Sequence, residues 1–138
     1  PNNFDDYMLA ETYVFTDLTF ESIRNSGIYF GIGFGSETMY GSTYVILYYL
    51  GSDNWSIRDA YTDDKENNVK FKPDQSKVQL LKKSWFTNIK IKDMNYSQMF
   101  YFKWKRILNK LDNYDYLGLR EWRSSKFPTI ASMGYLNK

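Results

Sequence analysis

Residues 27–35 constrain the fold more than any other stretch, because they alternate with a period of two. One face has Ile28, Phe30, Ile32 and Phe34, and the other has Tyr29, Gly31, Gly33 and Gly35. Alternation of this kind predicts a β-strand. Residues 42–50, STYVILYYL, are apolar on both faces, which is typical of a central strand that is covered on both sides. The two segments together predict a β-hairpin.

The glycines on one face of this strand have two interpretations. Glycine weakens a strand, so its repetition indicates that another backbone or a flat aromatic ring comes close at that face. Either the domain packs against itself there, or the face is a shallow floor for a ligand or partner, flanked by Tyr29 and Tyr49. The second interpretation makes Tyr29, Gly31, Gly33 and Gly35 candidate binding residues.

The strongest helical pattern lies at residues 95–111. Apolar residues recur there at spacings of three and four, at Tyr96, Met99, Phe100, Trp104, Ile107, Leu108 and Leu111. We expect helices also near residues 4–10 and 75–84, and strands at 84–92 and 114–124. Three segments stay open: a helix from Asp17 to Gly27 or a turn at 25–27, a strand or helix at 55–61, and an edge strand or helix after Pro128.

These patterns predict one α+β domain spanning residues 1–138. Its antiparallel sheet has about four to six strands, and the long amphipathic helix of the C-terminal half packs on one face. No apolar run approaches the ~18 residues needed to cross a membrane, and the N-terminal residues are acidic. We therefore expect a cytoplasmic protein without a membrane partner.

Charge divides the chain into two halves. Residues 1–66 have eleven acidic and three basic side chains, whereas residues 67–138 have five acidic and fifteen basic ones. The halves either neutralise each other within one fold or favour self-association or a polyanionic partner. Basic groups among aromatic rings suit nucleic acid. The candidate basic and aromatic residues are Lys103, Arg106 and Lys110 on the expected helix, and Tyr116, Arg120, Trp122 and Lys126 on the expected C-terminal strand.

Composition excludes several chemistries. The chain has no cysteine and no histidine, so it has no thiolate nucleophile, no imidazole base and no cysteine-ligated or histidine-ligated zinc. Carboxylate chemistry with Mg²⁺ remains, but no acidic pair lies on an evident shared face with a basic group beside it. We expect no catalytic residues, no metal site and no cofactor.

Two short signatures resemble those of the GIY-YIG nucleases. "GIY" stands at residues 27–29, "YLGS" at 49–52, and Arg58 follows near the place of that family's catalytic arginine. The resemblance implies a Mg²⁺-dependent DNA phosphodiesterase, with two tyrosines and the arginine around the phosphate and a metal-binding glutamate on a later helix. Residues 95–111 contain no glutamate, and Gln98 is a poor substitute.

The sequence therefore favours a small non-catalytic binding protein that inhibits or adapts a macromolecular partner, with a protein as the first choice. The alternatives are a nucleic-acid-binding protein that uses its basic aromatic half, or a degenerate nuclease of the GIY-YIG kind. The position of the basic residues distinguishes these functions. A single patch formed by Lys90, Lys92, Lys103, Arg106, Lys110, Arg120 and Lys126 would favour nucleic acid.

Overall fold

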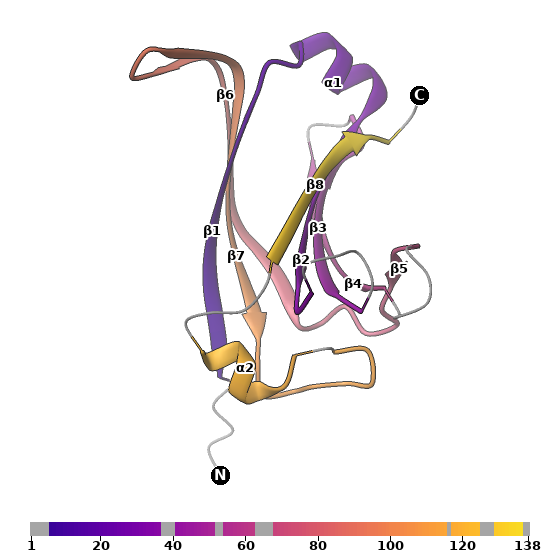
Figure 1. The fold of residues 1–138 in the computed structure, drawn as a ribbon. Coiled ribbons are helices and arrows are strands. Elements are labelled where there is room, and N and C mark those ends of the chain that lie inside the picture. Colours follow the sequence, from indigo (N-terminus) through magenta and orange to yellow (C-terminus); the bar gives the residue numbers. More distant parts are fainter. Residues whose placement is uncertain are drawn as a thin grey trace.

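The computed structural model describes residues 6–36, 41–51, 54–62, 68–115, 117–124 and 129–136. In this part of the chain, strands dominate and both helices are short (Figure 1). The elements in order are β1 (Tyr7–Thr16), α1 (Phe20–Ser26), β2 (Ile28–Phe34), β3 (Thr43–Tyr49), β4 (Trp55–Tyr61), β5 (Lys70–Phe71), β6 (Val78–Ile91), β7 (Met94–Ile107), α2 (Leu119–Arg123) and β8 (Thr129–Tyr135).

The strands form two antiparallel sheets that face each other (Figure 1). The three-stranded sheet has the order β1-β7-β6, and the five-stranded sheet has the order β5-β4-β3-β2-β8. Helix α1 connects β1 of one sheet to β2 of the other. Strands β6 and β7 form a hairpin of two 14-residue strands, longer than any other pair.

One hydrophobic core fills the space between the sheets. Phe30 on β2 has its ring 5.3 Å from that of Phe100 and 6.0 Å from that of Phe102, both on β7. Trp55 on β4 stacks on Phe30 at 5.6 Å. Aromatic pairs at such centroid distances add to the stabilisation from buried area. The buried side chains of both sheets therefore form one cluster, which joins the two layers.

The expected α+β architecture is wrong, because residues 94–107 form strand β7 and not a helix. From Gln98 onward, every second residue of β7 is buried: Gln98, Phe100, Phe102, Trp104 and Arg106. Apolar residues four apart, such as Phe100 and Trp104, share a face in a strand as well as in a helix. Met99 and Ile107 lie on the opposite face of the strand and supplied the spacings of three. Aromatic and β-branched residues, which are frequent in this segment, favour a strand.

The hairpin predicted from residues 27–50 is confirmed, since β2 and β3 pair along their whole length. Residues 20–26 form a helix that ends at Gly27, which is one of the two alternatives, although Thr19 and not Asp17 is its N-cap. Residues 55–61 form a strand, and an edge strand follows Pro128.

Three other expected elements are wrong. Strand β1 begins at Tyr7, inside the first expected helix, and β6 begins at Val78, inside the second. The strand expected at residues 114–124 contains helix α2. In the first two stretches, the pairing of β1 and of β6 with β7 decided the outcome over the local helical pattern.

Candidate functional site

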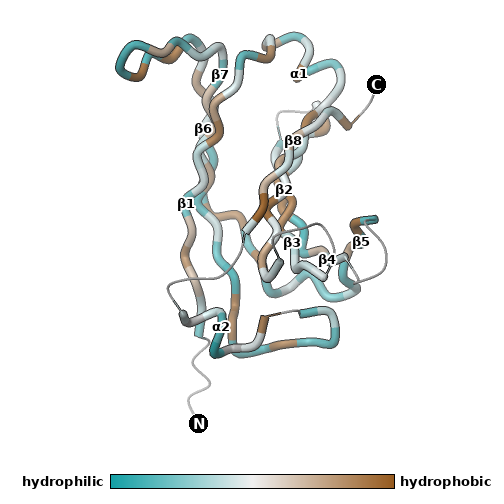
Figure 2. Tube along the Cα trace, in the orientation of Figure 1, coloured by the Kyte–Doolittle hydropathy of each residue, from teal (hydrophilic) through white to brown (hydrophobic). Residues whose placement is uncertain are grey.

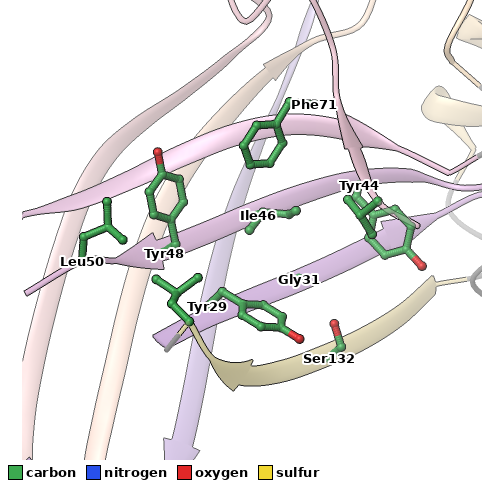
Figure 3. Close-up of a pocket in the computed structure, with 10 residues that line it drawn as sticks. Tyr29, Gly31, Tyr44, Ile46, Tyr48, Leu50, Phe71 and Ser132 are labelled. Carbon is green, nitrogen blue, oxygen red and sulfur yellow. The ribbon is translucent and has the colours of Figure 1, made fainter. Parts of the chain in front are cut away.

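A cavity lies on the outer face of the five-stranded sheet, and we name it the tyrosine cavity (Figure 3). Its volume is about 380 Å³. Strands β2, β3 and β8 provide its floor, and Phe71 on β5 stands at one side. Its lining is mainly apolar and aromatic: Tyr29, Gly31, Tyr44, Ile46, Tyr48, Leu50, Val69, Phe71, Ser132 and Leu136.

Glycines explain why two of the tyrosine rings lie against the sheet. Tyr44 is the cross-strand partner of Gly33, and a Cβ at Gly33 would come within 2.7 Å of the Tyr44 ring. Tyr29 is the cross-strand partner of Gly134 on β8, where a Cβ would come within 2.9 Å of the Tyr29 ring. A side chain at either glycine would push the ring away from the sheet.

The two interpretations of the glycine face therefore apply at different positions. Gly33 is covered by the Tyr44 ring, which is packing within the domain. Gly31 lines the cavity, and the nearest atom to a Cβ there is Ser132 Oγ, at 3.0 Å. Gly35 lies beyond the end of β2 with φ +99°. Tyr49 faces the core and is fully buried, so the flanking residue on β3 is Tyr48.

Arg58 stands beside the tyrosine cavity. It lies opposite Ile46 in the sheet, its Nε donates a hydrogen bond to Tyr48 Oη at 3.3 Å, and its guanidinium lies 5.4 Å from the centre of the Phe71 ring. All three neighbours line the cavity. No carboxylate among the residues that the structure describes is within ion-pair distance of Arg58. The guanidinium is thus held in place by aromatic side chains and has donors available.

The Tyr44 hydroxyl is a buried polar group at the end of this cavity. Among the described residues it has no hydrogen-bond partner in acceptable geometry, and Tyr44 is 3% exposed. Burial raises the pKa of Tyr44, and the nearby Ser42 side chain offsets part of that rise. Tyr44 therefore stays neutral near physiological pH and acts as a wall rather than as a base.

A second concave region, which we name the edge groove, lies between strand β1 of one sheet and strands β2 and β8 of the other. It has a volume of about 360 Å³ and is lined by residues 12–15 of β1, 30–32 of β2 and 131–133 of β8. Strands β1 and β8 are edge strands of different sheets, and within the described residues each pairs on one side only. The groove therefore has an unpaired strand edge on both sides and core-facing apolar residues at its base.

The outer face of β1 exposes large apolar side chains. Tyr7, Leu9, Tyr13 and Phe15 are 49%, 50%, 57% and 37% exposed. The remaining outward residue of this face, Glu11, accepts a hydrogen bond from the Tyr101 hydroxyl on β7, and this bond raises the pKa of Tyr101 to about 12. Four neighbouring apolar side chains on one strand are more than the scattered single ones found on most surfaces.

Arg106, one of the basic candidates for a binding surface, is not at the surface, because it is buried within an ionic cluster. Its two terminal nitrogens donate to Asp59 Oδ1 at 3.0 and 3.1 Å, and Nη2 also donates to Asp115 at 3.2 Å. The fully buried Lys72 pairs with Asp59 and Asp115 as well. Lys77 and Asp112 complete the cluster, which has three basic and three acidic groups. Much of the segment after β7 is coloured hydrophilic in Figure 2.

Burial is the main reason why the pKa of Asp59 is raised, although the charges of Arg106 and Lys72 act in the opposite direction. For Asp112, burial alone would also raise the pKa. The hydrogen bonds from Lys77 and from the Tyr114 amide, with the charge of Lys72, outweigh burial and lower it. The cluster is neutral overall and ties β4, β7 and the segment after β7 together, so its role is structural.

The other basic and aromatic candidates do not gather around Arg106. Lys103 and Arg106 lie on opposite faces of β7, Trp122 is buried under the Arg106 guanidinium, and Arg120 is exposed on α2. Tyr116 and Lys126 lie outside the described residues. Lys92 precedes β7 and Lys110 follows it, so a strand of about 40 Å separates them. The described residues of the expected basic patch, which runs from Lys90 to Lys126 in the sequence, therefore do not form one surface.

The pairing of β2 with β3 separates the two signature tyrosines of the nuclease resemblance. Tyr29 faces the tyrosine cavity, whereas Tyr49 faces the core between the sheets. The two hydroxyls and Arg58 therefore cannot surround one phosphate. Within the described ranges, no group of three acidic side chains is placed to hold a metal ion. A separate finding is that neither helix of this part of the chain has the length and apolar character needed to span a lipid bilayer.

Comparison with models of known protein families gives no match for this chain. Comparison with curated proteins gives no significant match either.

Proposed function

We propose that the protein is a non-catalytic binding protein that inhibits or adapts a protein partner, and that it binds this partner through strand β1. The observation that supports the proposal is that β1 combines an unpaired edge with an exposed apolar face. The strand is an unpaired edge of the three-stranded sheet, and it exposes Tyr7, Leu9, Tyr13 and Phe15 on its outer face.

An unpaired edge has a row of N–H and C=O groups that can bind another strand. In β-augmentation, an extended peptide pairs with such an edge, and pockets for its alternate side chains provide specificity. The edge groove supplies such a pocket beside residues 12–15 of β1. The occupant that fits is an extended partner segment with apolar residues at alternate positions.

Strand β1 also lacks the features that usually block edge pairing. Its sequence, YMLAETYVFT, contains no lysine, proline or glycine, and its one charged residue is Glu11. The opposite edge of the same sheet, β6, contains Lys82, Lys83 and Lys90 and has a register shift between Leu80 and Lys82. Since lysines and bulges protect edges, β6 is protected and β1 is open to a partner.

Selection of displayed random peptides against the intact protein tests this proposal. We expect enriched peptides with alternating apolar residues, and synthetic copies of them should slow amide hydrogen exchange in β1. The Leu9→Lys/Tyr13→Lys variant should weaken binding of these peptides at least tenfold, because it places two lysines on the pairing strand. Both positions are half-exposed or more, so the variant should still fold.

Leu111→Lys is the matched control, since Leu111 is 45% exposed but lies outside β1. It should leave peptide binding unchanged. Peptides that protect β6 or β5 instead of β1 would contradict the proposal, and so would binding that survives the double substitution. Duplex or single-stranded DNA that binds more tightly than any peptide, with a steep loss of affinity in salt, would favour the nucleic-acid alternative.

A further inference from the structure

We propose that the tyrosine cavity is a binding site for a small planar aromatic molecule with one anionic group. The site is separate from β1, because it lies on the outer face of the other sheet. Its volume of about 380 Å³ is near the lower end of the range of small-molecule sites, ~300–1,000 Å³, so the ligand is small.

The shape of the floor favours a planar ligand. Tyr29 and Tyr44 lie against the sheet over Gly134 and Gly33, and Gly31 between them has no side chain (Figure 3). A flat ring system can therefore approach the backbone at Gly31 while its edges meet the two tyrosines. Aromatic rings interact favourably in such offset and edge arrangements. A flexible aliphatic chain would not use this geometry.

Tyr48 and Phe71 form the opposite side of the cavity and determine where a charge would be bound. They hold the Arg58 guanidinium through the 3.3 Å hydrogen bond from its Nε and the 5.4 Å contact with the ring. The hydrogen bond uses Nε, so the terminal nitrogens can still donate to a carboxylate or sulfonate. Arg58 is half-buried, which makes its interaction with an anion stronger than it would be in bulk water.

Among the residues that the structure describes, no acidic side chain lines the cavity. Four of the lining residues have side-chain hydroxyls, and the Tyr44 hydroxyl is buried. The hydroxyls of Tyr29, Tyr48 and Ser132 therefore remain as candidate donors. Hydroxyls can donate to an anion, and no carboxylate of the described residues competes for Arg58. An apolar floor with a cation and hydroxyl donors at its side fits an amphipathic anion better than a neutral or cationic ligand.

Two fluorescent probes with the same ring system test the inference. Anilinonaphthalene sulfonate has one sulfonate, and phenylnaphthylamine has the same rings without it. The wild-type protein should bind one equivalent of the sulfonate at least about tenfold more tightly than the neutral probe, as expected for a charge-assisted contact. Arg58→Gln should remove most of this difference and leave binding of the neutral probe nearly unchanged.

Ile46→Phe supplies a second variant, because Ile46 lines the cavity and a larger ring there should block both probes. Lys105→Gln is the matched control. Lys105 also lies over an aromatic ring, with its Nζ 4.5 Å from the centre of Tyr7, but on the outer face of the other sheet. It should not alter the binding of either probe. Each variant should still unfold cooperatively on heating.

Three results would overturn the inference. The first is equal affinity of the wild-type protein for the two probes. The second is a loss of both probes in Arg58→Gln, which would make Arg58 a structural residue only. The third is a loss of the sulfonate probe in Lys105→Gln but not in Ile46→Phe, which would place the binding on the other sheet.

Discussion

Arg106 on β7 and Asp59 on β4 connect the two sheets through the interior, where both terminal nitrogens of the arginine donate to the same carboxylate oxygen. Neither side chain is more than 2% exposed. A buried pair of this kind contributes little net stability over a well-packed apolar pair, but each charge depends on the other. Removing one partner leaves the second charge buried without compensation.

We therefore expect Arg106→Met to lower the free energy of unfolding by ~3–5 kcal/mol, as measured in urea. The methionine keeps contact with Trp122 but leaves Asp59 and Asp115 facing only lysines. Arg120→Met, on an exposed position of α2, should change stability by less than ~0.5 kcal/mol. Equal stabilities for the two variants would show that the pair is not buried as described.

The same cluster predicts a dependence of stability on pH. The lowered pKa of Asp112 means that the folded protein binds its proton less readily than the unfolded chain does. This contribution to stability is present above the ordinary carboxyl pKa of about 4 and is lost as the pH falls through the lowered value. The raised pKa of Asp59 has the opposite sign, so Asp112 has to be tested alone.

Between about pH 5 and pH 3, the melting temperature of Asp112→Asn should therefore fall less than that of the wild type. Lys77→Met should show a similarly reduced loss, because Lys77 donates the hydrogen bond that holds Asp112 ionised. Melting curves across this pH range measure both effects. A steeper loss in Asp112→Asn than in the wild type would reverse the assigned direction of the shift.

The period of the apolar residues explains why the hairpin was predictable from the sequence and why the long strand β7 was not. Residues 28–34 alternate large apolar residues with Tyr29, Gly31 and Gly33, and a strand is the only regular structure with that period. In residues 96–108, apolar side chains stand four apart and also occur on the outer face. That pattern fits a helix and a strand equally, and the pairing of β7 with both β1 and β6 decided it.

The tyrosine cavity could be predicted only in part. Tyr29 and Gly31 were recognisable from their position on the glycine face, and both line the cavity. The second flanking tyrosine is Tyr48 and not the expected Tyr49, because Tyr48 is the residue that pairs with Tyr29 in the sheet. Arg58 and Ser132 enter the site through strands β4 and β8, which are far apart in the sequence. No local pattern predicts the order of strands in a sheet, so these residues could not be assigned from the sequence alone.

Trp104 remains a core residue although its helix does not exist. It is 1% exposed, and its indole N–H donates to Thr12 Oγ1 at 2.9 Å. Trp104→Ala should lower the free energy of unfolding by ~3–5 kcal/mol or abolish soluble expression. Trp104→Phe keeps most of the packing and should cost less. A Trp104→Ala protein with an unchanged melting temperature would contradict the core assignment.

The last prediction concerns Gly31 and Gly33, which lie on the same face of β2 but differ in what covers them. At Gly33 an added Cβ would meet Tyr44 at 2.7 Å and Ile130 at 2.9 Å, so Gly33→Ala should force the Tyr44 ring off the sheet and cost ~1–3 kcal/mol. At Gly31 the only close atom is Ser132 Oγ at 3.0 Å, and a serine hydroxyl can rotate away. Gly31→Ala should therefore be neutral or slightly stabilising, since it restricts the unfolded chain.

A double variant separates the clash from a general intolerance of side chains in β2. Gly33→Ala combined with Tyr44→Ala removes the ring that the new methyl group meets, so its cost should be less than the sum of the two single costs. Urea unfolding of the four proteins and the wild type measures this coupling. Strictly additive costs, or a Gly31→Ala variant as unstable as Gly33→Ala, would mean that the whole glycine face is closed by packing and that no ring can lie on Gly31.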